Sequence, residues 1–395
     1  MLELEKNYLD NAQKQAREKG LYDFPIFDAD CHHMTTPFNE IAEFLEEPWK
    51  TRLMKSETVA KFNTLPRDLG DRTIGGRLKS IGLFANHPKP EGERLPSEVY
   101  PLLESSMKMG IDYNLVFPTD LLTLGLHPQV DQEEAIAFGY ARWVTEKILP
   151  CDESLVTMLY LPFGSPKACV RLVEEFAEKP GVVGFMVTST RYQPIYHEDY
   201  MPLYRLLEEK GKPLGFHTVS YWMERPFQQF NRFLSAHAMG FPFYNMIQLT
   251  NIVINGLPER FPGLKFLFIE AGVSWIPYMI HRLDNEYMFR SSEAPMLTKL
   301  PSEYIKNFYF TSQPLEHMED MEYMEKVFKM FDAENHLLYA SDFPHQDFDT
   351  PSSIYDLPFL GEEAKRKILG GNAFKLFGIE QPKLLAKNRL LKSSI

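Results

Sequence analysis

Short apolar runs recur along the chain, and each is followed by a longer segment whose apolar residues come every three or four positions. The short runs have the length of buried strands, and the longer segments have the period of amphipathic helices. The runs lie at residues 25–28, 113–117, 155–161, 182–187, 213–217, 264–269, 308–311 and 336–340. The helical patterns include 133–149, 166–179, 200–210, 275–287 and 320–331.

Strands that alternate with helices favour a parallel sheet covered by helices, because each parallel connection needs a crossover. Eight such units predict a distorted (β/α)8 barrel, a TIM barrel of the α/β class, and an open doubly wound sheet is the alternative. We expect one domain over residues 1–395 with its core at 24–377. The stretches 38–110 and 221–262 exceed a minimal barrel and are predicted insertions after strands 1 and 5. There they would cover the mouth of the barrel as a lid or form a subunit contact.

The charge of the chain restricts its partners. It has 42 Lys and Arg against 54 Asp and Glu, a net charge of −12, and no basic block. This composition argues against nucleic acid and against an anionic membrane surface. No apolar stretch approaches the ~18 residues of a membrane-spanning helix, and the charged amino-terminal segment does not resemble a signal peptide. The three cysteines lack CxxC spacing, which favours a reducing compartment, so we expect a cytoplasmic protein.

Polar side chains that can bind a metal ion follow several of the predicted strands. The first run leads into Asp30 and His32, the fifth ends at His217, and Asp342 follows the eighth. Alternate residues of a strand share a side, so Asp30 and His32 can reach one ion together, and Asp28 shares that side. In a closed barrel strand 8 is the neighbour of strand 1. The sequence therefore predicts one divalent ion, and these ligand types do not choose among Zn²⁺, Mn²⁺ and Fe²⁺.

Other polar residues of the same region are candidates for catalysis or substrate binding. Asp342 and Glu270 could act as bases, and Glu270 could instead orient a ligand histidine. His345, three residues after Asp342, and His237, in the second predicted insertion, are further catalytic candidates. His33 is expected to point away from His32 and to pack outside the barrel. The candidates for substrate binding are Arg191, Trp222 and Arg225.

The segments FDADCH, GFH, RFPGLKFLFIEAGVSWIPYMIHRLDNEY, FTSQP and YASDFPHQDF resemble the amidohydrolase-related metal-dependent enzymes of the aminocarboxymuconate-semialdehyde decarboxylase type. The resemblance covers residues 24–377 and implies a (β/α)8 barrel that holds a divalent metal. The ligands that it implies are Asp30, His32, His217 and Asp342. Decarboxylating members of the family that the chain resembles usually have a histidine at the end of strand 6, where this chain has Glu270. The glutamate that many relatives carry before the proline at position 37 is also missing, which disfavours a second metal ion.

These features predict a metal-dependent hydrolase that attacks a small carboxylated or carbonyl-bearing metabolite with a metal-activated water. Hydrolysis is placed first because of Glu270. The alternatives are a non-oxidative decarboxylase, an iron or manganese non-heme oxygenase, and a metal-retaining partner subunit of such an enzyme. The aromatic-rich insertions need cover and predict an oligomer, formed either with identical copies or with a homologous subunit.

Overall fold

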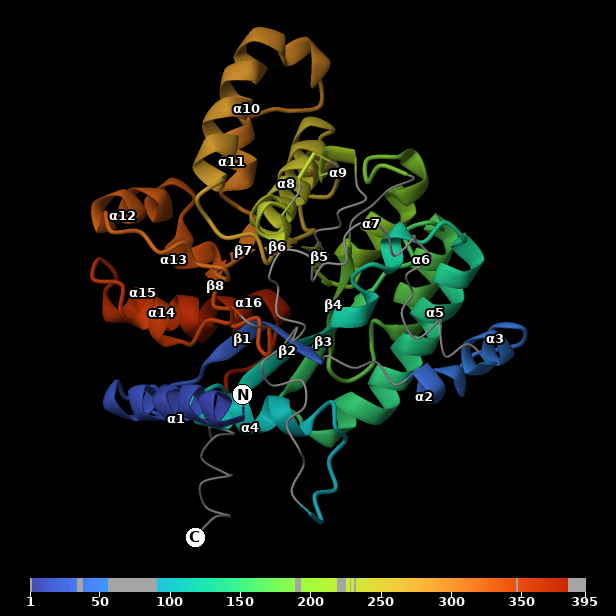
Figure 1. Ribbon diagram of the computed structural model, residues 1–395. Coiled ribbons are helices and arrows are strands. Elements are labelled where there is room, and N and C mark those ends of the chain that lie inside the picture. The colour runs from blue at the N-terminus through green and yellow to red at the C-terminus, as the bar shows by residue number, and fades with distance from the viewer. Residues whose placement is uncertain are drawn as a thin grey trace.

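In the computed structural model, eight parallel strands form one sheet whose order follows the chain from β1 to β8 (Figure 1). The structure describes residues 2–33, 38–55, 91–188, 193–218, 225–227, 229–230, 232–345 and 347–382. The strands are β1 (Phe27–His33), β2 (Tyr113–Pro118), β3 (Leu155–Tyr160), β4 (Val182–Val187), β5 (Leu214–His217), β6 (Phe266–Ile269), β7 (Tyr309–Thr311) and β8 (Leu337–Leu338).

The first and last strands of the sheet are joined by backbone hydrogen bonds. Ala29 N donates to Tyr339 O at 2.9 Å, and Asp342 N donates to Asp30 O at 2.7 Å. A parallel bridge also pairs Cys31 with Phe343. The predicted (β/α)8 barrel is therefore confirmed, and the open doubly wound sheet is excluded because its two edge strands would not meet.

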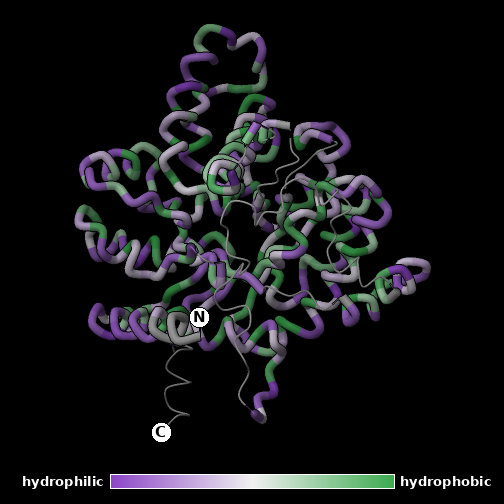
Figure 2. The backbone as a smooth tube through the Cα atoms, viewed as in Figure 1, coloured by the Kyte–Doolittle hydropathy of each residue, from purple (hydrophilic) through white to green (hydrophobic). Residues whose placement is uncertain are grey.

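Helices surround the strands (Figure 1). They are α1 (Leu2–Glu18), α2 (Phe38–Ala42), α3 (Trp49–Lys55), α4 (Tyr100–Met109), α5 (Val130–Trp143), α6 (Pro166–Phe176), α7 (Met201–Glu209), α8 (Phe233–Ile254), α9 (Leu257–Arg260), α10 (Ile276–Arg290), α11 (Pro301–Ile305), α12 (Met321–Met330), α13 (Ala333–His336), α14 (Ser352–Tyr355), α15 (Glu362–Arg366) and α16 (Asn372–Phe377). Figure 2 shows that hydrophilic residues are frequent on the outer helices α1, α10 and α12, as expected for helices that bury one face.

The observed strands match the predicted runs closely, with informative differences at the first and the last. β1 spans Phe27–His33 instead of residues 25–28, because its backbone bonds to β2 on one side and to residues after β8 on the other. β8 contains only Leu337–Leu338 instead of residues 336–340. The first motif mixes apolar and polar residues, yet it forms a strand that is buried along its whole length.

Close packing fills the inside of the barrel. A Cβ on Gly184 or Gly215 would lie 2.8 or 2.9 Å from Met158 Cε, so these two glycines make room for that side chain. On the opposite face of the strands, toward the helices, Phe268 stacks on Phe216 and Phe310 of the adjacent strands, with ring centroids 5.4 and 5.5 Å apart. The barrel is thus a packed core, and chemistry is confined to its ends.

The predicted insertions are only partly described. The first contains α2, α3 and α4, and its residues 56–90 lie outside the described part of the chain. The second contains α8, which packs against α10 and α11. Their roles as lid or subunit contact stay predictions. In the described ranges, no helix combines the length and the apolar character needed to cross a membrane.

A buried carboxyl group links the outer helix α5 to the connection that follows β3. Glu133 Oε1 accepts hydrogen bonds from Tyr160 Oη at 2.6 Å and from Gly164 N at 3.4 Å. Burial outweighs these hydrogen bonds and raises the pKa of Glu133 to about 7. The folded chain therefore retains a proton that the unfolded chain releases at lower pH.

We predict that Glu133→Gln reduces the pH dependence of stability. Between the ordinary glutamate pKa of about 4.3 and pH 7 the folded state binds the extra proton, so the free energy of unfolding falls as pH rises, by on the order of 3 kcal/mol. Urea unfolding at pH 5 and pH 8 would show that the free energy of unfolding falls less in the variant than in the wild type. Glu174→Gln, at an exposed position of α6, is the matched control. If the free energy of unfolding fell as much in Glu133→Gln as in the wild type between these two pH values, the prediction would be contradicted.

Candidate metal centre

The carboxyl end of β1 supplies two side chains of the candidate centre. Asp30 and His32 are buried, and His32 Nε2 lies 3.2 Å from Asp30 Oδ1. His33 faces the opposite way, and its Nε2 lies 3.0 Å from Tyr140 Oη of α5. The predicted alternation along this strand is confirmed, although a register irregularity between Asp28 and Cys31 interrupts its pairing with β2.

His217, the last residue of β5, meets this pair across the barrel. Its Nε2 lies 3.3 Å from Asp30 Oδ1 and 3.3 Å from His32 Nε2. Two donor atoms bound to one ion at about 2.1 Å are about 3.0 to 3.4 Å apart in octahedral or tetrahedral geometry. The three atoms therefore have the spacing of neighbouring ligands around a single ion.

Asp342, which follows β8, joins the cluster through His32. Its Oδ1 lies 3.2 Å from His32 Nε2 and 2.6 Å from His345 Nδ1. The possible ligands in the described part of the chain form two overlapping sets that share His32. One set is Asp30, His32, His217 and Glu270, and the other is His32, Asp342 and His345.

Buried oxygen atoms without partners show that the cluster fits a cation. Asp30 Oδ2 and Asp342 Oδ2 are both buried and accept no hydrogen bond from the described residues. Taking a carboxylate out of water without compensation costs several kcal/mol, which a shared divalent ion would offset. The mixed imidazole and carboxylate donors suit Zn²⁺, Mn²⁺ or Fe²⁺.

The electrostatics of the cluster favour charged carboxylates beside a charged imidazole. Burial disfavours protonation of His32, but Asp30 and Asp342 outweigh it and raise the pKa of His32 to about 9. Burial also works against ionisation of Asp30, yet His217 and His32 hold its pKa below the usual range. The pKa of Asp342 is likewise lowered, because His345 and His32 outweigh its burial. In the absence of metal, a proton on His32 thus takes the place of a cation.

Glu270 follows β6 and lies behind His217. Its Oε2 is 3.6 Å from His217 Nδ1, the ring nitrogen that faces away from Asp30. A carboxylate at this nitrogen fixes the orientation of a ligand histidine and increases its basicity. Glu270 and Asp342 both have left-handed backbone, with φ of 53° and 60°, a conformation that costs non-glycine residues energy and is frequent at functional sites.

Asp28 has a structural role that its position in the sequence does not reveal. Its Oδ1 accepts from Ser341 N at 2.8 Å and from Asp30 N at 3.2 Å, while its Oδ2 accepts from Ser341 Oγ at 2.5 Å. Asp28 therefore ties β1 to the residues after β8, directly below Asp30 and next to Asp342. The spacing Asp28–Asp30 was the only signal for it, since the partner Ser341 is remote in the sequence.

His345 connects Asp342 with the end of β2. Its Nδ1 contacts Asp342 Oδ1, and its Nε2 lies 3.2 Å from Thr119 Oγ1 in the short 3₁₀ helix η1 (Thr119–Leu121). Sequence reasoning did not find Thr119, because a threonine after a strand is too common to indicate a role. Thr119, His345 and Asp342 thus form a row of side chains within hydrogen-bond distance of one another.

The remaining predicted residues lie apart from the cluster or outside the described chain. His237, on α8, is partly exposed, and its Nε2 lies 4.0 Å from Asp347 Oδ2. It is absent from both sets of possible ligands. Arg191 and Trp222 fall outside the described residues, and Arg225 begins the 3₁₀ helix η6 (Arg225–Phe227) without a described side chain. Their predicted roles stay predictions.

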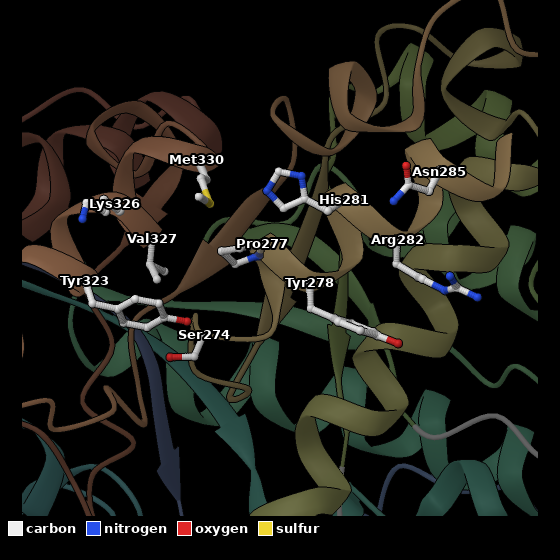
Figure 3. A pocket seen from close by; sticks show the side chains of 10 residues that line it. All are labelled: Ser274, Pro277, Tyr278, His281, Arg282, Asn285, Tyr323, Lys326, Val327 and Met330. Carbon is white, nitrogen blue, oxygen red and sulfur yellow. The ribbon is translucent and has the colours of Figure 1, made fainter. Parts of the chain in front are cut away.

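A pocket of about 470 Å³ lies outside the barrel, between α10 and α12 (Figure 3). It is lined by Ser274, Pro277, Tyr278, His281, Arg282, Asn285, Tyr323, Lys326, Val327 and Met330. None of these residues belongs to the cluster of possible metal ligands. Among the described residues, the possible metal ligands lie at the strand ends and not in this pocket.

A closed (β/α)8 barrel with buried histidines and carboxylates at its strand ends defines the class of metal-dependent barrel enzymes. The sequence matches the Amidohydrolase family over residues 29–379, so the chain belongs to that family. This result confirms the resemblance found in the motifs and identifies the chain as an enzyme of the amidohydrolase superfamily.

Several characterised proteins are similar to the chain. The γ-resorcylate decarboxylase of Polaromonas sp. is 21% identical over 236 residues, which cover 56% of this chain and 69% of that protein. The crystal structure of an amidohydrolase from Mycobacterium avium subsp. paratuberculosis has a TM-score of 0.67 at 18% identity, covering 90% of this chain and 99% of that one. The crystal structure of a dihydroxybenzoic acid decarboxylase of Polaromonas sp., with bound manganese and the inhibitor 2-nitroresorcinol, has a TM-score of 0.62 at 15% identity. The match covers 90% of this chain and 97% of that one. The structural likeness supports the fold.

We predict that His217→Ala and Asp342→Ala each lower bound metal below half of one ion per chain, because each removes a candidate ligand. Elemental analysis after loading with Mn²⁺ measures the content, and circular dichroism checks the fold. His281→Ala, at an exposed position of α10, is the control with the same substitution. Full metal content in both site variants would refute the assignment.

Metal binding is also expected to release a proton. With a pKa of about 9, His32 is protonated at pH 7.5 in the metal-free protein and must lose that proton to act as a ligand. Apparent affinity should therefore rise with pH up to about 9. Titration calorimetry with Mn²⁺ in two buffers of different ionisation enthalpy counts the protons. If no protons were released on Mn²⁺ binding at pH 7.5, the prediction would be contradicted.

Proposed function

We propose that the chain is a metal-dependent decarboxylase that removes CO₂ from a small carboxylated molecule without oxidation. The observation that carries the proposal is the Asp342–His345 pair, whose 2.6 Å contact joins a candidate metal ligand to a group that can carry a proton. The decarboxylase activity of the relatives supports the same choice. It was the alternative to hydrolysis in the sequence interpretation, and the comparisons favour it.

Glu270 was the reason to place hydrolysis first, and its position weakens that reason. Its carboxylate lies beside His217 Nδ1, where it acts on the orientation of the histidine. A base that activates water must instead reach the attacking water molecule. We therefore propose a positioning role for the carboxylate after β6 and a role in proton transfer for the carboxylate after β8.

Decarboxylation breaks the bond between the carboxyl carbon and the neighbouring carbon, releases CO₂ and leaves an electron pair that must take up a proton. A bound divalent ion supplies positive charge that holds substrate oxygens and stabilises negative charge. His345 Nδ1 lies 2.6 Å from Asp342 Oδ1, so the pair can pass a proton to that electron pair. Thr119, at His345 Nε2, offers a route for its replacement.

We also propose one divalent ion, to be tested first with Mn²⁺ because a relative of the same fold was solved with manganese. Assembly with a second copy is part of the proposal. This proposed assembly is supported by exposed apolar side chains near the carboxyl end of α10, where Met288 is 64% and Phe289 82% exposed. A cytoplasmic location and a homologous partner subunit stay predictions.

We predict that the Mn²⁺-loaded chain converts at least one member of a panel of aromatic and aliphatic acids with release of labelled CO₂ from a ¹³C-carboxylate. In D₂O the product should carry deuterium at the carbon that lost CO₂. His345→Gln should lower kcat by a factor of about 10² to 10⁴ while metal is retained, since positioned proton transfer typically accelerates a reaction by that factor. His281→Gln is the control. Incorporation of ¹⁸O from water into a cleaved product without CO₂ would favour the hydrolase.

A further inference from the structure

The peptide group between Ile269 and Glu270 is held at both of its polar atoms by side chains from other elements. Asn245 of α8 donates from Nδ2 to Ile269 O at 3.0 Å, and Glu270 N donates to Thr311 Oγ1 of β7 at 3.0 Å. Asn245 and Thr311 are both buried. Because a peptide group is planar, hydrogen bonds at its oxygen and at its nitrogen fix the orientation of the whole plane.

The direction of the Glu270 side chain depends on this plane. Ile269, the last residue of β6, pairs with His217 of β5, so their side chains share one side of the sheet. In a continued strand the next side chain would point to the opposite side, away from His217. Glu270 instead rotates about its N–Cα bond to a φ of 53°, and its Oε2 lies 3.6 Å from His217 Nδ1. The left-handed backbone thus turns this carboxylate back toward the candidate metal centre.

A left-handed backbone at a non-glycine residue persists only where the surrounding structure enforces it. The loop that follows Glu270 is held in a similar way. Val273 N and Ser274 N donate to the carboxylate of Glu316 at 3.2 and 3.0 Å. A Cβ on Gly272 would lie 2.6 Å from Glu316 Oε1, so the two segments are in close contact. The end of β7 and the connection after it therefore hold the chain on both sides of Glu270.

We infer that Asn245 and Thr311 are positioning residues of the metal centre, which act through Glu270 on His217. Their hydrogen bonds set the peptide plane, and the plane sets where the Glu270 carboxylate meets His217 Nδ1. The opposite ring nitrogen, Nε2, then faces Asp30 Oδ1 at 3.3 Å. This inference rests on the proposed metal ion and not on the proposed reaction. It gives helix α8 of the second insertion a function at the centre that is separate from that of a lid.

The test measures Mn²⁺ affinity by titration calorimetry. Thr311→Val keeps the shape of the side chain and removes the hydroxyl, Thr311→Ser keeps the hydroxyl, and Asn245→Leu removes the amide donor. Glu270→Ala removes the carboxylate through which both residues are inferred to act. Thr157→Val is the matched control, because Thr157 is also buried in a strand, β3, and its Oγ1 donates to Val116 O at 2.8 Å.

Glu270→Ala should weaken Mn²⁺ binding by about 10- to 100-fold, and Thr311→Val and Asn245→Leu by about tenfold, since partners of a metal-binding histidine have effects of that size. Thr311→Ser should bind Mn²⁺ within about twofold of the wild type. Thr157→Val should lower the melting temperature and leave Mn²⁺ affinity unchanged. Combined with Glu270→Ala, Thr311→Val should add less than about twofold to the loss, because the two residues act along one path.

Wild-type affinity in Thr311→Val or in Glu270→Ala would overturn the inference. An equal loss from Thr311→Val with and without the Glu270 carboxylate, or an equal loss in Thr157→Val, would also overturn it, because either result shows a general effect of lost stability. If Asn245→Leu does not fold, the Thr311 variants decide. Affinity is measured without turnover, so absence of CO₂ release would count against the proposed reaction alone, whereas a wild type that binds no Mn²⁺ would overturn the metal centre and this inference together.

Discussion

The buried hydrogen bonds between Asp28 and Ser341 are the constraint on which the site depends. They join the first strand of the barrel to the residues after the last one, so they close the ring and set the heights of Asp30 and Asp342 relative to each other. The backbone bond from Asp342 N to Asp30 O, 2.7 Å long, follows from this register. Two carboxylates from opposite ends of the chain thereby reach one imidazole, His32, at 3.2 Å each.

This arrangement stores unfavourable interactions that a ligand can relieve. Two buried carboxylates retain oxygen atoms without partners, and two residues at strand ends have a left-handed backbone. Packing of the surrounding barrel enforces both conditions, because a close-packed core cannot relax around a single strained residue.

The roles of the two acidic residues at β6 and β8 show why motif letters alone do not define a reaction. The resemblance noted in the sequence led us to expect a histidine at the position of Glu270 in a decarboxylase, and this difference pointed to hydrolysis. In three dimensions its carboxylate faces the outer nitrogen of His217, while Asp342 has its own histidine partner, His345. The neighbours of each carboxylate, which the motif does not show, therefore decide what chemistry it can take part in.

The sequence by itself determined the eight strands, the class of fold and the shared side of Asp30 and His32, because residue periodicity and the C-terminal location of barrel sites are local or general rules. Only the tertiary structure decided which nitrogen of His217 meets Glu270, that Asp342 turns toward His345, and that His237 lies near Asp347 and not among the possible ligands. The partner of Asp28, Ser341, could not be identified from the sequence either. Each of these features depends on side-chain rotamers and loop paths, which are fixed by contacts between residues far apart in the chain.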